Sequence, residues 1–264
     1  MCSKPLIDFD LIFYILKLFI QILHLNLSWL FHPTPQLKFS FQRRMTDDIQ
    51  TQPISDALQS KINLFRTTTD LRTFQIDTQT DKIFVNLNYL AEISEYFHIL
   101  RTGSYTEKAS EKVILDDVFT EELVIFLSYA CPEGFEFDRT INQQNITALA
   151  YFSDRFMVPW VKQEIKKYFK SEDFKQEIYD TEMLIQLCYL LRAQSYASAD
   201  IDPVFQKIAR YGDVAAVDKA VAILPDKESR IYIGERIIFF RPYTFTVRPQ
   251  SYFNWNDNRA RLFF

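Results

Sequence analysis

The sequence predicts an α+β fold, in which a small sheet packs against helices and a mainly helical region follows. Two strand-like runs, residues 71–77 and 82–85, flank a polar stretch suited to a hairpin turn. A third short strand, residues 113–115, follows a helical segment. From Thr120 onward, apolar residues recur mostly at helical spacing. This order indicates a mixed domain, and no internal repeat of a solenoid or propeller type is visible.

The helices around the sheet can be read from their caps and apolar faces. Ser55 is suited to cap a short helix whose apolar face consists of Ile54, Leu58, Ile62 and Phe65. That face is expected either to pack on its own domain or to form a dimer contact. A helix over residues 88–102 is expected to end at Gly103. Further helices are predicted at residues 120–130, 142–156, 159–169 and 180–192, and over 203–224 with an interruption at 211–213.

Composition argues against several classes of function. The net charge of the chain is −4, and residues 45–264 alone carry −7, which is a poor match for the phosphates of nucleic acid. The three cysteines, Cys2, Cys131 and Cys188, do not suggest a disulfide framework. No histidine follows His98, so no metal site and no catalytic residue is predicted. We therefore expect neither an enzyme nor a cofactor, and no nucleic acid as a partner.

The N-terminal residues 11–31, which begin at Leu11 and end at Phe31, leave several interpretations open. The segment is long enough to cross a bilayer, but Lys17 opposes insertion. Lys17, Gln21, His24 and Ser28 fall on one stripe of a helix, which favours an amphipathic helix lying on a membrane or docked on protein. A start at Met45, which would leave the segment out of the main product, is the third interpretation.

The run IFVNLNYLAEISEYF, residues 83–97, resembles the strand and helix that carry the signature of BTB/POZ domains, in the style of the large divergent animal sets. Residues 103–107 are similar to its Gly-x-aromatic-x-Glu turn, and VILDDVFTEELVIFL, residues 113–127, to a strand, an Asp-Asp-Val exit and a helix. Residues 145–159 resemble a later helix of the family, with Asp154 and Phe156 near its end. These features follow the family's order over about 100 residues.

The resemblance implies a homodimer, helped by a helix before the first strand, here the one with Ile54, Leu58, Ile62 and Phe65. Many family members also bind a cullin scaffold and present clients to a ubiquitin ligase. An apolar-x-Glu motif assists that contact, and the nearest matches here, Ile141-Asn142-Gln143 and Asn145-Ile146-Thr147, lack the glutamate. Ile141, Gln143 and Ile146 are therefore the candidate residues facing a cullin. Gln143 can accept hydrogen bonds there, but without the help of a charge.

The segments after the domain carry no motif of the family. Residues 236–247 interleave basic and aromatic residues, which favours a strand or an extended tail laid on the helices, or a segment that docks a partner. We divide the chain into a hydrophobic or amphipathic segment (1–44), a linker and dimerisation helix (45–69), a BTB/POZ domain (70–170) and a mainly helical region (171–264).

The function expected from this division is that of a homodimeric adaptor. It would bring an unidentified client protein to a cullin-based ubiquitin ligase in the cytoplasm or the nucleus. The alternative is a scaffold or oligomerisation protein unconnected with ubiquitin, associated with a membrane through residues 11–31.

Overall fold

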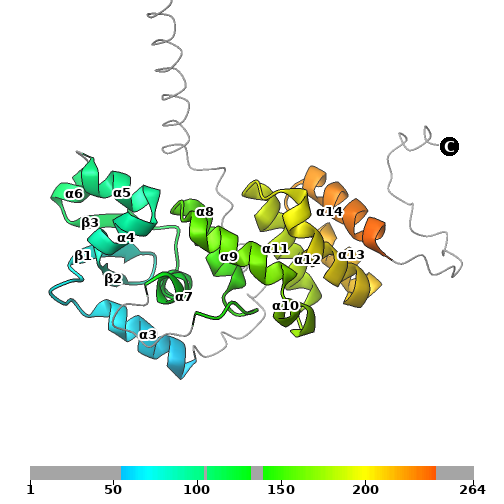
Figure 1. Ribbon diagram of the computed structural model, residues 1–264, viewed down its shortest axis with the longest axis horizontal. Helices are drawn as coiled ribbons and strands as arrows, with labels where there is room; N and C mark the ends of the chain where they lie inside the picture. The colour runs from blue at the N-terminus through cyan, green and yellow to red at the C-terminus, as the bar shows by residue number, and fades with distance from the viewer. Residues whose placement is uncertain (1–54, 104–105, 132–138, 242–264) are drawn as a thin grey trace, which may run out of the picture.

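A computed structural model describes residues 55–103, 106–131 and 139–241 of the 264-residue chain (Figure 1). It confirms the α+β fold, with a three-stranded sheet near one end. The sheet-containing half comprises α3 (Asp56–Arg66), β1 (Phe74–Thr78), β2 (Lys82–Val85), α4 (Leu87–Ile93), α5 (Glu95–Thr102), α6 (Thr106–Ala109), β3 (Lys112–Leu115) and α7 (Thr120–Ala130). The helices that follow are α8 (Ile146–Arg155), α9 (Pro159–Lys170), α10 (Glu172–Gln176), α11 (Thr181–Ala193), α12 (Ser198–Tyr211), α13 (Val214–Ala222) and α14 (Lys227–Phe240).

The sheet combines the predicted hairpin with a strand that returns from the helices. Its order is β2-β1-β3, with β1 antiparallel to β2 and parallel to β3. Parallel neighbours need a crossover connection, and α4, α5 and α6 form it here. Ile76 pairs with Ile83 on one side and Val113 on the other, and all three side chains are buried. Because side chains alternate along a strand, one face of the sheet joins the core and the other meets solvent.

The helix predicted over residues 88–102 proves to be two helices, α4 and α5, separated at Ser94. Ser94 has an extended backbone, and its hydroxyl accepts a hydrogen bond from the Phe97 backbone N–H at 3.2 Å. The same hydroxyl donates to the Phe156 carbonyl oxygen at 2.6 Å. The bend at Ser94 therefore attaches the start of α5 to the end of α8.

Other helix boundaries also differ from those predicted. Residues 142–145 form a turn, so the helix expected from Asn142 begins at Ile146. The helix α12 begins at Ser198, five residues before Pro203, and the proline lies inside it. Residues 236–240, expected to be extended, complete α14. The interruption predicted at residues 211–213 is confirmed, because Gly212 ends α12 and Asp213 caps α13.

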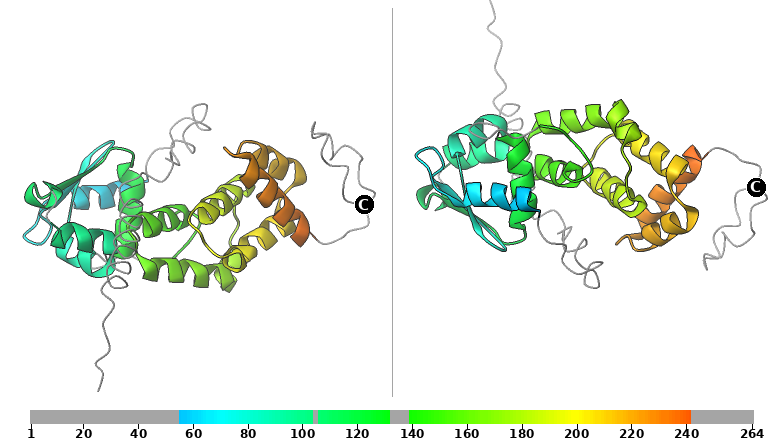
Figure 2. Two further views of the ribbon diagram at one scale, coloured as in Figure 1. Left: turned by 90° about the horizontal axis from the view of Figure 1, so that it is seen from above. Right: turned by 90° about the horizontal axis from the view of Figure 1, so that it is seen from below.

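The core runs through the length of the described residues. Phe126, Phe152 and Phe156 form its centre between α7 and α8, with ring centroids 5.4–5.7 Å apart. The helices α8 and α9 lie in the middle and contact α11 and α12, which belong to the helical end. Both views of Figure 2 place the sheet and α3 at one end and α14 at the other. The molecule is thus elongated, but its buried apolar side chains form one cluster.

Candidate functional site

The helix α3 packs its predicted apolar face on its own domain. Ile62 and Phe65 are almost fully buried and Leu58 is half-buried, while α3 contacts α7 and β2. Ile54 lies outside the described residues. Packing on its own domain, one of the two expectations for this face, therefore accounts for Ile62 and Phe65. The dimer contact assigned to these residues stays a prediction.

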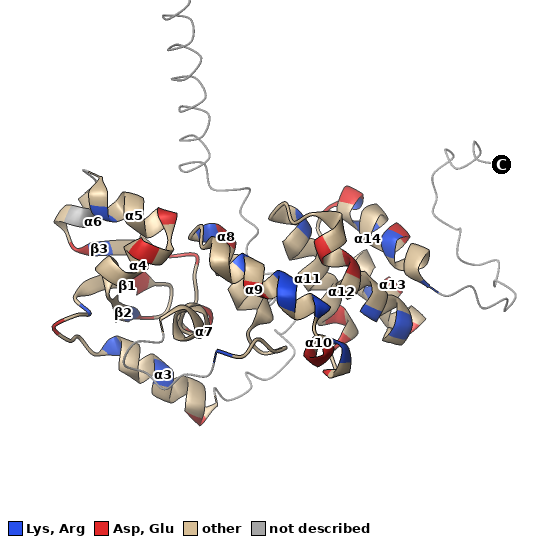
Figure 3. Ribbon diagram, viewed as in Figure 1, with Lys and Arg blue, Asp and Glu red and all other residues tan. Residues whose placement is uncertain are grey.

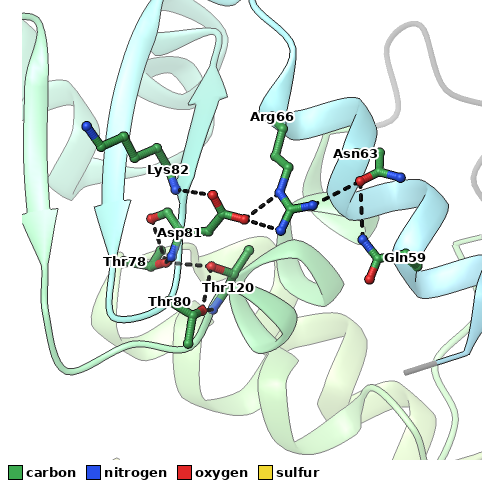
Figure 4. Close-up of polar contacts among 8 residues, drawn as sticks. All are labelled: Gln59, Asn63, Arg66, Thr78, Thr80, Asp81, Lys82 and Thr120. Carbon is green, nitrogen blue, oxygen red and sulfur yellow. Dashed lines mark hydrogen bonds and ion pairs between the residues drawn. The ribbon is translucent and has the colours of Figure 1, made fainter. Parts of the chain in front are cut away.

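A polar network holds α3 against the hairpin and α7 (Figure 4). The Arg66 guanidinium forms an ion pair with Asp81, and its Nη1 donates to Asn63 Oδ1 at 3.1 Å. The other oxygen of Asp81 accepts from the Lys82 backbone N–H at 2.8 Å. Exposed ion pairs contribute little to stability, about 0–1 kcal/mol. The Arg66–Asp81 pair instead helps to fix the position of α3 relative to the sheet.

Three threonines continue the network to the start of α7. The hydroxyls of Thr78 and Thr120 lie 2.5 Å apart, and the Thr80 hydroxyl donates to the Thr120 hydroxyl at 2.9 Å. The Thr120 backbone N–H donates in turn to Thr80 Oγ1 at 3.3 Å. The residue before α7, Phe119, makes no side-chain capping hydrogen bond, so the hairpin supplies a cap for this helix. The turn, α3 and α7 are thereby joined through side chains (Figure 4).

The candidate cullin-facing residues lie on one loop but differ in exposure. Ile146 is fully buried and Ile141 packs partly against the core, so these two anchor the loop. Gln143 and Gln144 are exposed. Asn142 and Asn145 cap the turn, because the Gln144 N–H donates to Asn142 Oδ1 at 2.9 Å and the Asn142 N–H to Asn145 Oδ1 at 3.0 Å. The two glutamines are thus held outward by a defined turn.

A carboxylate from the helical end reaches this loop. Glu177 Oε1 accepts a hydrogen bond from the Gln143 backbone N–H at 3.0 Å, and its other oxygen accepts from the hydroxyls of Tyr168 and Tyr179. Burial alone would raise the pKa of Glu177, but these hydrogen bonds hold that pKa below its ordinary value. The loop therefore has a negative charge beside it, although its own sequence supplies none.

Lys207 on α12 completes the joint between the two ends of the molecule. Its side chain is buried, and its ammonium donates to the carbonyl oxygens of Phe174 and Lys175 at the end of α10. The ammonium lies 4.7 Å from the centroid of the Phe174 ring and 5.2 Å from that of Tyr179. Burial lowers the pKa of Lys207, and Glu177 opposes that shift.

A surface cavity of about 490 Å³ opens beside this joint, between the α10–α11 connection and the end of α12. Glu177, Tyr179 and Lys207 line it, together with the strongly exposed Ile178 and Tyr211. Sequence reasoning missed these five residues, because residues 171–180 carry no periodic pattern and because Lys207 and Tyr211 come from a separate helix, α12. An apolar Ile178 among charged neighbours was the one available signal.

Among residues 55–103, 106–131 and 139–241, no cluster of His, Cys, Asp or Glu side chains is arranged to hold a metal ion. His98 is exposed on α5, and burial raises the pKa of the Cys188 thiol. No described helix is both long and apolar enough to cross a bilayer, and residues 11–31 lie outside the described ranges.

The segments that carry the family resemblance meet in one core. Ile83, Phe97 and Val118 are all buried there, with the helices through Phe169. A model of the BTB/POZ domain family matches residues 62–173. This protein contains a BTB/POZ domain. The match runs from the second half of α3 to the start of α10, and it includes the loop with Gln143.

The chain is also similar to a named relative. The chain is 25% identical over 139 residues to the BTB and MATH domain-containing protein 38 of Caenorhabditis elegans. That alignment covers 52% of this chain and 32% of the relative, so the matched part is about a third of that protein's length. BTB/POZ domains mediate protein–protein interactions, and the surfaces of α3, the Gln143 loop and the cavity beside Lys207 are the places to seek them here.

Proposed function

We propose that this protein is a homodimeric adaptor whose BTB/POZ domain recruits a cullin scaffold, so that a client is held near a ubiquitin ligase in the cytoplasm. The match of residues 62–173 to the BTB/POZ family carries this proposal. Such an adaptor works by proximity and needs no catalytic group of its own. The surfaces required are a face for a second copy, a face for the cullin and a face for the client.

The outward face of α3 suits the contact with a second copy. Ala57, Ser60 and Leu64 are exposed and follow one another at spacings of three and four residues, so they form a stripe on the side away from Ile62 and Phe65. Small side chains at Ala57 and Ser60 allow another helix to approach closely. Leu64, 39% exposed, supplies the apolar contact.

The loop of residues 139–145 suits the contact with a cullin. Gln143 stands where the family's motif has its glutamate in the match Ile141-Asn142-Gln143, and the exposed Gln144 follows it. The carboxylate of Glu177 lies against the same turn. A charge beside the loop supports charge-assisted hydrogen bonds to a partner. The cavity rim with Ile178 and Tyr211 is the candidate client surface, since it is apolar, exposed and outside the glutamine loop.

Capture of a cullin by the immobilised full chain tests the proposal. Replacing both loop glutamines, Gln143→Arg with Gln144→Arg, places two bulky positive charges on the proposed contact, and we expect cullin affinity to fall by at least about tenfold, which corresponds to about 1.4 kcal/mol. Gln206→Arg, on the exposed side of α12, is the matched control and should change affinity less than twofold.

Two outcomes would contradict the adaptor proposal. One is a wild-type chain that forms an oligomer but does not capture a cullin, which favours a scaffold unconnected with ubiquitin. The other is equal loss of cullin affinity in the loop variant and the Gln206→Arg control, because the loop would then have no special part in binding. Membrane fractionation that depends on residues 1–44 would add support for a membrane-associated scaffold.

A further inference from the structure

The outward face of α14 carries three large apolar side chains, although α14 already packs on α12 and α13 with its other side. Ile233 and Ile237 are buried against the neighbouring helices. Ile231, Ile238 and Phe239 are 47%, 66% and 68% exposed. A single exposed isoleucine is ordinary, but three large apolar side chains along one helix form a patch that marks an interaction surface.

Gly234 gives this patch the shape of a helix-docking surface. It lies three residues after Ile231 and four before Ile238, so the three residues share one stripe. A Cβ atom added at Gly234 would meet nothing within 4 Å, so the packing of this chain gives no reason for a glycine there. Glycine is unfavourable inside a helix, and a missing side chain between two isoleucines lets another backbone come close.

Phe239 is held in place at the edge of the patch. Arg236 makes bidentate hydrogen bonds of 2.7–3.0 Å to the Asp202 carboxylate, which fix its guanidinium on α12. That guanidinium lies 5.1 Å from the centroid of the Phe239 ring. This contact favours one orientation of the exposed ring before a partner binds, which lowers the entropy cost of binding.

We propose that a second copy of this chain docks on the α14 patch, with the two α14 helices antiparallel across a two-fold axis between residues 234 and 235. Ile231 and Ile238 lie at equal distances from this point, as a two-fold contact requires. Ile231 of each copy therefore lies opposite Ile238 of the other, and the notch at Gly234 lies at the crossing, beside Glu235 of the other copy. Glu228, which pairs with Arg192 of its own chain, comes opposite Arg241 of the other copy.

The position of α14 makes this contact compatible with a dimer through α3. The two helices lie at opposite ends of the described molecule (Figures 1 and 2). The α14 contact does not require the α3 dimer. If both form, however, each copy joins two neighbours and dimers link into longer assemblies, a consequence that rests on the proposed function. One helix pair is smaller than the usual interface of about 1,600 Å², so we expect weak, concentration-dependent association.

Sedimentation equilibrium of the full chain tests the contact. Ile238→Glu should weaken self-association at least tenfold, because it places a charge in the apolar contact. Gly234→Leu should weaken it similarly while leaving the monomer folded, since the notch is open in the single chain. Ile114→Glu is the matched control, because Ile114 is 61% exposed on β3, at the other end of the molecule. Glu235→Gln should strengthen association, because the two Glu235 carboxylates lie near the axis.

A cross-linking experiment tests the antiparallel arrangement. In a background with Cys2→Ser and Cys131→Ser, full chains with Ile231→Cys and with Ile238→Cys carry tags of different size. Mild oxidation of a mixture should join one chain of each kind. Each variant alone should cross-link poorly, because like positions lie about 10 Å apart along the helix axis. Cross-links between two chains of the same variant, with none between the two different variants in the mixture, would overturn the antiparallel pairing.

The results also separate this contact from the dimer through α3. Leu64→Glu should remove the α3 dimer and leave the α14 dimer, Ile238→Glu should do the reverse, and the double variant should be a monomer. Self-association that is unchanged by Ile238→Glu and Gly234→Leu overturns the proposal, even if Leu64→Glu disrupts the other dimer. That same result would be expected if residues 242–264 of the same chain cover the patch.

Discussion

At the scale of single residues, Glu177 links the loop of residues 139–145 to the helical end by accepting three hydrogen bonds. We expect Glu177→Gln to lower the free energy of unfolding by about 1–2 kcal/mol at pH 7, because hydrogen bonds to a charged acceptor are stronger than those to an amide. Urea denaturation measures the change. Glu164→Gln, which removes an exposed pair with Lys167, is the control and should cost less than about 0.5 kcal/mol.

The lowered pKa of Glu177 adds a pH dependence with a definite sign. A carboxyl whose pKa is lower in the folded state stabilises the fold above its unfolded value, 4.5 here, and that stabilisation is lost as the pH falls through the folded pKa. The free energy of unfolding of the wild type should therefore fall more steeply below pH 4.5 than that of Glu177→Gln. If the free energy of unfolding of the two proteins changes with pH in the same way, Glu177 is not the group that causes the loss of stability at low pH.

At the scale of elements, Ser94 shows what one buried hydroxyl contributes. It caps α5 and donates to the Phe156 carbonyl oxygen while only 3% exposed. We expect Ser94→Ala to lower the free energy of unfolding by about 1–3 kcal/mol, through loss of the cap and an unsatisfied buried carbonyl. Thermal unfolding measures this change. The control is Ser60→Ala, on the exposed face of α3, whose free energy of unfolding should stay within about 0.5 kcal/mol of that of the wild type. Equal effects of the two substitutions would contradict the role of Ser94.

Gly234 makes a second prediction at the scale of elements. Because a Cβ at this position meets open space, Gly234→Ala should raise the free energy of unfolding by about 0.5–1 kcal/mol through its effect on α14 alone. Chemical denaturation at a concentration where the chain is monomeric measures this change. A destabilised variant would mean that the glycine has a packing role inside the chain.

The sequence predicted elements well where local chemistry decides them. The strand of residues 82–85, the Ser55 cap and the proline start of α9 all follow from local chemistry, and each is confirmed. The break at Ser94 could not be predicted, because the hydroxyl is held by a carbonyl 62 residues away. Residues 236–240 suggested an extended segment from composition, but Ile237 finds a buried site against the neighbouring helices. Tertiary contacts overrode local preference at both places.

The candidate site also has a part that the sequence could predict and a part that depends on tertiary contacts. The loop with Ile141, Gln143 and Ile146 could be chosen from its resemblance to a family motif. Its anchoring could not be predicted, since Ile146 is fully buried and only Gln143 of the three is exposed. Glu177 and Lys207 meet across 30 residues, at a joint that no local pattern announces. The contribution of the helical end to the loop is therefore visible only in three dimensions.

At the scale of the whole molecule, the BTB/POZ domain and the helices after it share one core. Phe169, Phe174 and Phe205 are each almost fully buried, and α9 contacts both α10 and α12. We expect one cooperative unfolding transition, with equal calorimetric and van't Hoff enthalpies for the full chain. Two separated transitions would show that the helical end folds as an independent unit.

The charge distribution also belongs to this scale. Figure 3 shows acidic and basic residues mixed along the described helices α9–α14. Such mixing lets neighbouring charges pair, as Lys166 and Lys170 of α9 do with Asp200 of α12. It is compatible with the several protein contacts that an adaptor needs.

The proposed function requires a dimer of this chain that binds a cullin through its BTB/POZ domain. Sedimentation velocity of the full chain carrying Ile238→Glu, mixed with a purified cullin scaffold, tests both requirements together, because the substitution removes the α14 contact. We expect a complex of two chains with two cullins, which is lost when Gln143→Arg and Gln144→Arg are added. A chain that sediments as a monomer and never moves with the cullin would contradict the proposed function.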